Sequence, residues 1–127
     1  MEAKPRMSLR AAVLGAPDAG TLAGFYQQLL GWRLAEEEPG WARLEPPDGG
    51  TTCLSFQTEE LYTPPVWPPR AGHQQMSAHL DIRVDDLDAA SAYAQSLGAT
   101  PADHQPQDNV RVHRDPAGNI FCLFAVA

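Results

Sequence analysis

Basic residues are scarce in this chain: its 127 residues hold 9 Lys and Arg against 16 Asp and Glu, a formal net charge of −7. No cluster of Lys or Arg interrupts that balance, so duplex nucleic acid or an anionic membrane surface would be repelled. Long apolar runs are also lacking, because the longest, 120–127, is far too short to cross a bilayer. We therefore expect neither a nucleic-acid partner nor a membrane partner.

Cysteine is scarce as well, with Cys53 and Cys122 alone in the sequence. Both lie in apolar, strand-like stretches, and neither has the nearby second cysteine that zinc-binding hairpins use. This usage is typical of proteins in a reducing compartment and predicts a cytoplasmic location. The length fits a single domain over 1–127 with an ordinary apolar core.

An internal repeat organises the chain. Four landmarks recur in one order and at nearly the same spacing, which chance among common turn signals explains poorly. The matching pairs are Asp18 with Asp86, Leu30-Gly31 with Leu97-Gly98, Pro47-Asp48-Gly49 with Pro116-Ala117-Gly118, and Cys53-Leu54 with Cys122-Leu123.

Each half of the repeat has the order strand, helix, strand, strand, strand by its periodicity and turn signals. The first half predicts strands at 9–16, 32–37, 41–45 and 51–57 with a helix at 19–30. The second predicts strands at 79–84, 99–102, 110–114 and 120–126 with a helix at 86–97. A proline-rich linker, 58–78, separates half-modules 9–57 and 79–126, since its prolines exclude regular structure.

Three segments of the chain resemble the vicinal oxygen chelate superfamily of glyoxalases, bleomycin-resistance proteins and extradiol dioxygenases. They are 22–32, 79–86 and 115–123, and the likeness is to the single-domain glyoxalase-like group. The resemblance implies an α+β fold in which two βαβββ modules form a curled, half-open mixed sheet with the helices outside and the ligand inside. It also implies a homodimer, in which the pocket lies within one chain or across the interface.

Polar and apolar residues alternate along three of the expected strands, as in His79-Leu80-Asp81-Ile82-Arg83. Alternate side chains point to opposite faces of a sheet, and the apolar face should meet a helix. The polar faces then see either water or, with the curled sheet, one cavity whose mouth Trp67 covers. The ligand-binding residues expected on this basis are Ser55, Gln57, Trp67, His79, Asp81, Arg83, Arg111 and His113.

The superfamily's catalytic metal has a poor ligand set in this chain. Resemblance places its four ligand positions at Ala11, Cys53, His79 and Cys122. Alanine cannot bind a metal, and Cys122 stands where the family usually has Glu, so we expect no metal cofactor. The alternative is zinc or another divalent metal held by Cys53, His79 and Cys122.

The predicted function is to bind a small, partly aromatic organic molecule without a catalytic metal, as sequestration-type resistance proteins of the superfamily do. The alternative is a glyoxalase-type lyase, isomerase or dioxygenase. Its catalytic residues would be His79 with a divalent metal, or His79 with Asp81 as base. Ion pairing between these two side chains is the simpler explanation of their proximity.

Overall fold

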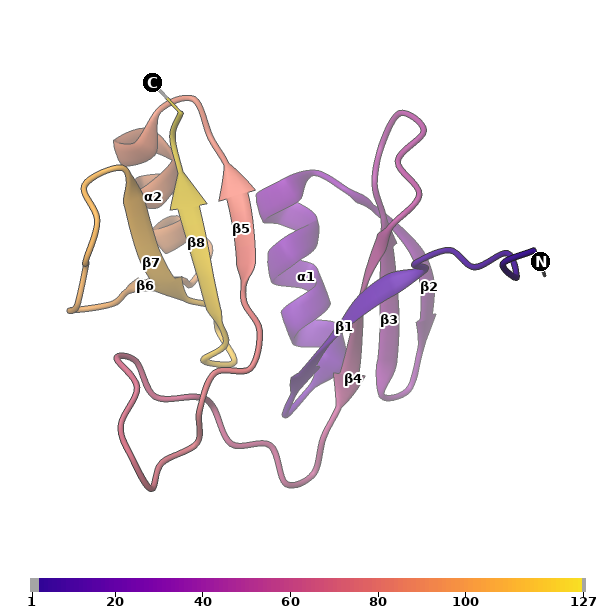
Figure 1. The fold of residues 1–127 in the computed structure, drawn as a ribbon, viewed down its shortest axis with the longest axis horizontal. Coiled ribbons are helices and arrows are strands. Elements are labelled where there is room, and N and C mark those ends of the chain that lie inside the picture. The colour runs from indigo at the N-terminus through magenta and orange to yellow at the C-terminus, as the bar shows by residue number, and fades with distance from the viewer. Residues whose placement is uncertain (1–2, 127) are drawn as a thin grey trace.

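The computed structural model describes residues 3–126 and contains two modules of the same element order (Figure 1). The first module consists of β1 (Ala11–Ala16), α1 (Ala19–Leu30), β2 (Arg33–Glu38), β3 (Trp41–Glu45) and β4 (Cys53–Thr58). The second consists of β5 (Leu80–Arg83), α2 (Leu87–Ser96), β6 (Thr100–Pro101), β7 (Val110–Arg114) and β8 (Ile120–Phe124). The predicted repeat and the α+β class are confirmed.

Each module has one four-stranded mixed sheet, and the two sheets have the same strand order. The orders are β1-β4-β3-β2 and β5-β8-β7-β6. In both sheets the first and last strands of the module pair in parallel, and the remaining pairs are antiparallel. The sheets are not hydrogen-bonded to each other, so no closed barrel forms within residues 3–126.

The repeated aspartates begin the two helices. The Asp18 carboxylate accepts a hydrogen bond from the Thr21 backbone N–H at 2.9 Å, and Asp86 does the same for Ala89 at 3.0 Å. Gly31 ends α1 in the left-handed conformation, with φ of 70°, which glycine adopts without steric cost. Neither helix is long and apolar enough to span a bilayer.

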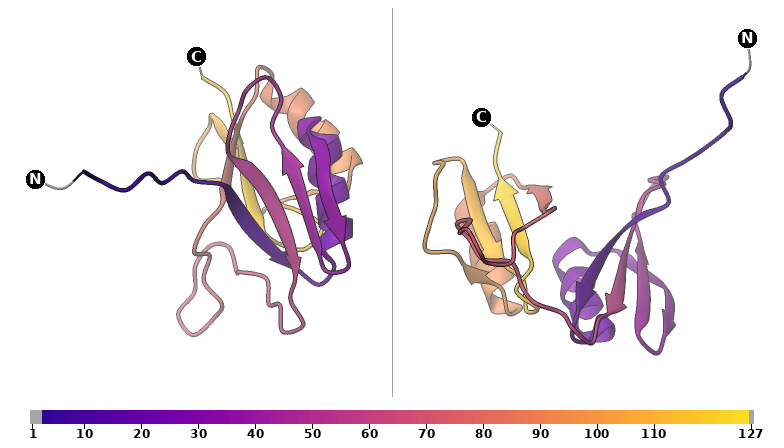
Figure 2. Two further views of the ribbon diagram at one scale, coloured as in Figure 1. Left: turned by 90° about the vertical axis from the view of Figure 1, so that its right-hand side faces the viewer. Right: turned by 60° about the horizontal axis from the view of Figure 1, so that its bottom comes forward.

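Helix α1 lies between the two sheets, and its apolar side chains join both modules into one core (Figures 1 and 2). Phe25 and Tyr26 contact Phe121 of β8, with ring centroids 5.8 and 6.0 Å apart. Tyr26 also stacks on Phe56 of β4, at 5.7 Å. We call the face of each sheet that carries this core its helix face, and the opposite face its outer face.

The segment between β4 and β5 contains no helix or strand among its residues, all of which the structure describes. It nevertheless contributes to packing, because Trp67 and Met76 lie against Val112, Ile120 and Cys122 on the outer face of the second sheet. The Trp67 indole N–H donates a hydrogen bond to the His104 carbonyl at 3.0 Å. The predicted linker thus covers part of the outer face of the second sheet.

Candidate functional site

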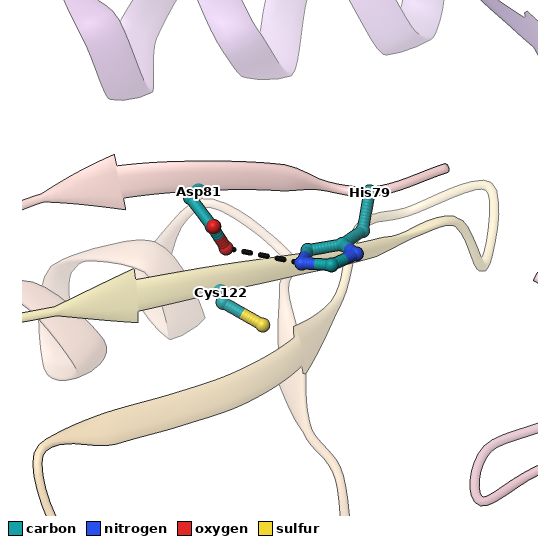
Figure 3. A group of neighbouring side chains, drawn as sticks. All are labelled: His79, Asp81 and Cys122. Atoms are coloured by element: carbon teal, nitrogen blue, oxygen red, sulfur yellow. Dashed lines mark ion pairs between the residues drawn. The ribbon is translucent and has the colours of Figure 1, made fainter. Parts of the chain in front are cut away.

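Three chemically active side chains meet on the outer face of the second sheet: His79, Asp81 and Cys122 (Figure 3). His79 Nε2 lies 3.1 Å from Asp81 Oδ1, and the possible ligand atoms of all three residues lie within 4.8 Å of one another. Among residues 3–126, this is the group of His, Cys, Asp and Glu side chains that is compact enough to share an ion.

Strand alternation and register bring these side chains together. Asp81 of β5 is directly paired with Cys122 of β8 in the parallel ladder, so the two side chains share a face. The intervening Leu80 and Ile82 belong to the core on the helix face. His79 immediately precedes β5 and has the same parity as Asp81, which turns its imidazole toward the carboxylate.

The cluster borders a cavity of about 240 Å³ on the outer face, which we call the outer hollow. Its lining residues are His79, Asp81, Gln107, Asn109, Val110, Cys122 and Phe124. A second cavity, of about 320 Å³, lies where the two modules meet, and we call it the seam cavity. Its lining residues are Ala12, Leu30, Trp32, Thr52, Cys53, Leu54, Leu80, Asp81 and Ile82. Asp81 lines both cavities, so they are neighbours.

Cys122 is a poor nucleophile in this environment. Burial raises the pKa of its thiol, and the nearby Asp81 carboxylate raises it further. Both effects favour the neutral thiol, whereas nucleophilic cysteines need the thiolate. The His79 and Asp81 side chains are more open, at 37% and 62% exposed. Together the three residues offer hydrogen-bond donors and acceptors beside the apolar walls of Val110 and Phe124.

The predicted orientation of Arg111 and His113 is wrong. His113 is fully buried on the helix face, stacked on Phe121 with a centroid distance of 5.2 Å. Its Nδ1 lies 3.1 Å from the Arg111 carbonyl and its Nε2 2.8 Å from the Ser91 hydroxyl of α2. Arg111 likewise turns toward α2, with Nη2 4.0 Å from Asp88.

The physical reason for this error lies in the neighbouring valines of β7. Val110 and Val112 occupy the outer face, where Val112 is buried in an apolar cluster to which Val110 and the linker residues Trp67 and Met76 also belong. The rule that apolar residues face the helix therefore fails for this strand, because both of its faces are covered. A histidine can occupy the helix face because polar groups of the chain satisfy both of its ring nitrogens.

Ser55 and Gln57 lie on the outer face of the first sheet, not beside the cluster. Ser55 pairs with Arg43 of β3 and is buried, and its hydroxyl has no hydrogen-bond partner among the described residues. Gln57 donates a hydrogen bond from Nε2 to Glu59 at 2.7 Å. The prediction that one cavity within a single chain contains all these residues is therefore wrong. Some of the residues lie on the outer face of the first sheet, some on the outer face of the second sheet, and Arg111 and His113 face α2.

Arg83 and Trp67 remain on the second module. Arg83 is paired with Phe124 in the ladder, at the end of β5, and has the same parity as Asp81. Trp67 packs over Val112, Ile120 and Cys122 and does not line the outer hollow. Sequence reasoning missed Gln107 and Asn109, which lie in an irregular loop without periodicity, and Trp32, whose place at the seam depends on how the modules pack.

The family's metal ligands do not fit this chain. Ala11 has no ligand atom, and its ladder partner Cys53 lies on the first sheet. Arg43 Nη1 is 3.7 Å from the Cys53 sulfur, a cationic neighbour that opposes a second positive charge there. Cys53 does not join His79 and Cys122, whereas Asp81 does. The predicted alternative set of Cys53, His79 and Cys122 is therefore not assembled.

Comparison with known proteins supports the architecture. The model of a family described as a glyoxalase-like domain matches residues 11–124. No curated protein matches the chain. A glyoxalase/bleomycin resistance protein/dioxygenase family enzyme from Burkholderia phytofirmans PsJN is similar in structure, with a TM-score of 0.71 and 23% identity over 95% of this chain and 100% of that one.

Two further solved structures share the fold. An antibiotic binding protein from Streptomyces sp. CB03234 has a TM-score of 0.62 and 22% identity, over 98% of this chain and 100% of its own. A possible glyoxalase from Bacillus cereus has a TM-score of 0.67 and 11% identity, over 94% of this chain and 99% of its own. At these identities the likeness is one of fold.

Proposed function

This chain belongs to the glyoxalase-like domain family, and we propose that it binds a small, partly aromatic organic molecule without a catalytic metal. The polar part of the ligand binds His79 and Asp81 in the outer hollow, and its apolar part enters the adjacent seam cavity. The observation that carries this proposal is the assembly of His79, Asp81 and Cys122 beside apolar walls, in a chain whose family ligand set is incomplete at Ala11.

The chemistry of the lining suits a flat ligand with hydrogen-bonding groups. Apolar walls with a few convergent polar groups are typical of small-molecule sites. Trp32 and Phe124 provide aromatic surface, while Asp81 provides a hydrogen-bond acceptor and His79 provides ring nitrogens that can donate or accept. The antibiotic binding protein from Streptomyces shows that this fold can bind an organic molecule, which is consistent with the proposal.

A second copy of the chain is the partner we propose, in a cytoplasmic homodimer without nucleic acid or membrane. The outer face of the first sheet supports this, because Val13 on β1 is half exposed beside the buried Ser55 hydroxyl, which has no hydrogen-bond partner within residues 3–126. Analytical ultracentrifugation should give twice the chain mass. A monomer at micromolar concentration would contradict the dimer. This result would not bear on ligand binding, which is tested separately below.

One observation favours an enzyme as the second candidate. A carboxylate that orients an imidazole at 3.1 Å is an arrangement suited to a general base. His79 would then take a proton from a bound substrate, and Asp81 would stabilise the imidazolium that results. The enzyme candidate predicts turnover that His79→Gln abolishes, whereas the binding proposal predicts stoichiometric capture without product.

The binding proposal can be tested by calorimetry on chelator-treated protein with planar aromatic compounds that carry amine, amide or carboxylate groups. We expect saturable 1:1 binding that His79→Gln and Asp81→Asn weaken. His73→Gln and Asp103→Asn are the matched controls, since both residues are exposed and lie outside the two cavities. Equal losses in controls and site variants would contradict the proposed site.

A further inference from the structure

One turn of the second module is buried against the first module. Between β7 and β8, Asp115 accepts a hydrogen bond on Oδ2 from the Tyr26 hydroxyl of α1, at 2.7 Å. Tyr26 and Asp115 are only 0% and 3% exposed. Asn119 of the same turn donates from Nδ2 to the Gly15 carbonyl of β1, at 2.9 Å. Two directional bonds thus reach a helix and a strand of the other module.

The turn holds Asp115 ready for this contact. Asp115 Oδ1 accepts hydrogen bonds from the backbone N–H groups of Ala117 and Asn119, at 2.9 and 3.0 Å. These bonds fix the side chain so that Oδ2 faces Tyr26. On the other side, Tyr26 is wedged between aromatic rings of both sheets, Phe56 and Phe121. Neighbouring contacts therefore fix the orientation of both side chains that form the bond.

The surroundings of this bond exclude water. Tyr62 of the linker has a buried hydroxyl without a hydrogen-bond partner among the described residues. Burial, followed by the Asp115 charge, raises the pKa of Tyr62 to about 12. Burial likewise raises the pKa of the Asp115 carboxyl, against the hydrogen bonds that it accepts. A hydrogen bond in such a medium is stronger and more directional than one in water.

The repeat supplies an internal comparison for this contact. Tyr26 and Tyr93 occupy equivalent positions in α1 and α2, at the same distance before Leu30-Gly31 and Leu97-Gly98. Tyr93 also bonds across the modules, donating to the Gln28 carbonyl of α1 at 3.2 Å, but it is half exposed and this bond lies at the surface. In the turn of the first module, Pro46 stands where the second module has Asp115. The buried bond is thus not a consequence of the repeat.

We propose that the Tyr26–Asp115 bond is a positioning device that fixes the orientation of the two modules and so keeps the seam cavity in shape. No strand pairing joins the sheets, and apolar contacts such as those around α1 are not directional, so the buried hydrogen bonds supply the directional constraint between the modules. The seam cavity takes Ala12 and Leu54 from one module and Leu80 and Ile82 from the other. The expected effect on ligand binding rests on the proposed function, whereas the effect on the orientation of the two modules does not.

Residual dipolar couplings measured by NMR on the full chain test this directly. In the wild-type protein the couplings of 9–57 and 79–126 should fit one alignment tensor. Tyr26→Phe should require two tensors of different magnitude, because the modules then move relative to each other. Tyr93→Phe, the matched comparison, removes an exposed bond between the modules and should retain one tensor, because water can replace an exposed bond. A single tensor in folded Tyr26→Phe would overturn the proposal, even if that variant were less stable.

Two further measurements keep the test decisive. If Tyr26→Phe does not fold, Asn119→Ala removes the part-buried bond to Gly15 and leaves the Tyr26–Asp115 bond intact, so this variant should retain one tensor. Two tensors in Asn119→Ala would then refute the assignment of the orientation to Tyr26 and Asp115. In the ligand arm, Tyr26→Phe should bind the aromatic probe at least about tenfold more weakly, and Tyr93→Phe as the wild type does. The tensor result needs no ligand, so failure of ligand binding contradicts the proposed function alone.

Discussion

His113 should make the protein sensitive to acid below neutral pH. Its imidazole is fully buried between Phe121 and α2, and that burial lowers the pKa of the ring, with the positive charge of Arg111 acting in the same direction. A carbonyl can only accept, so Nδ1 donates to the Arg111 carbonyl, and in the neutral ring Nε2 accepts from the Ser91 hydroxyl. The lowered pKa favours this neutral form. The folded state therefore holds the neutral tautomer.

The sign and size of the effect follow from linkage. A histidine whose pKa is lower in the folded state binds more protons after unfolding, so the free energy of unfolding rises with pH. The contribution of neutral His113 is complete above its ordinary pKa of about 6.5 and is lost as the pH falls toward the folded value. In that window the slope from one such group is at most about 1.4 kcal/mol per pH unit.

Urea unfolding between pH 5 and 8 measures this contribution, with His113→Gln as the variant and His73→Gln as the control. Other groups titrate in both proteins and cancel in the difference between the two curves. The wild type should be more stable than His113→Gln at pH 8, and its advantage should shrink below pH 6.5. The control, which alters an exposed linker residue, should follow the wild type. Parallel curves for wild type and His113→Gln would refute a buried neutral imidazole.

Two other outcomes are expected from the structure. Trp67→Ala should weaken ligand binding by about 1–3 kcal/mol in calorimetry, because the indole supports Cys122 and Val112 beneath the site; unchanged affinity in a folded variant would contradict this. Metal analysis of the purified protein by inductively coupled plasma mass spectrometry should find no stoichiometric divalent metal, because Ala11 and Cys53 leave the family's ligand set incomplete; one equivalent of zinc, lost in His79→Gln, would contradict this.

Much of the architecture could be predicted because each element has a local physical signal. Asp18 and Asp86 cap the helices, Gly31 ends the first one, and the repeated turn signals fall between the expected strands. Boundaries were less predictable where strand pairing decides them. The strand expected over 99–102 is reduced to β6 at Thr100–Pro101; Pro101 contributes no N–H, and the Ala102 N–H adds one further bond, to the Val112 carbonyl at 2.9 Å.

The site was predictable only in part. Parity placed His79 and Asp81 on one face, and the parallel register of β5 and β8 then brought Cys122 opposite Asp81. The misplacement of His113 came from a covering layer that is remote in sequence, the linker with Trp67 and Met76. The bond between Tyr26 and Asp115 likewise spans most of the chain, and no local pattern indicates it. Long-range packing thus decides what strand alternation leaves open.

Titration of chelator-treated protein with a planar aromatic compound, followed by calorimetry, tests the central claim most directly. The account predicts saturable 1:1 binding without added metal, a clear loss in Asp81→Asn, and no loss in the exposed control Asp103→Asn. Binding that appears only after a divalent metal is restored, or that Asp81→Asn leaves unchanged, would contradict it.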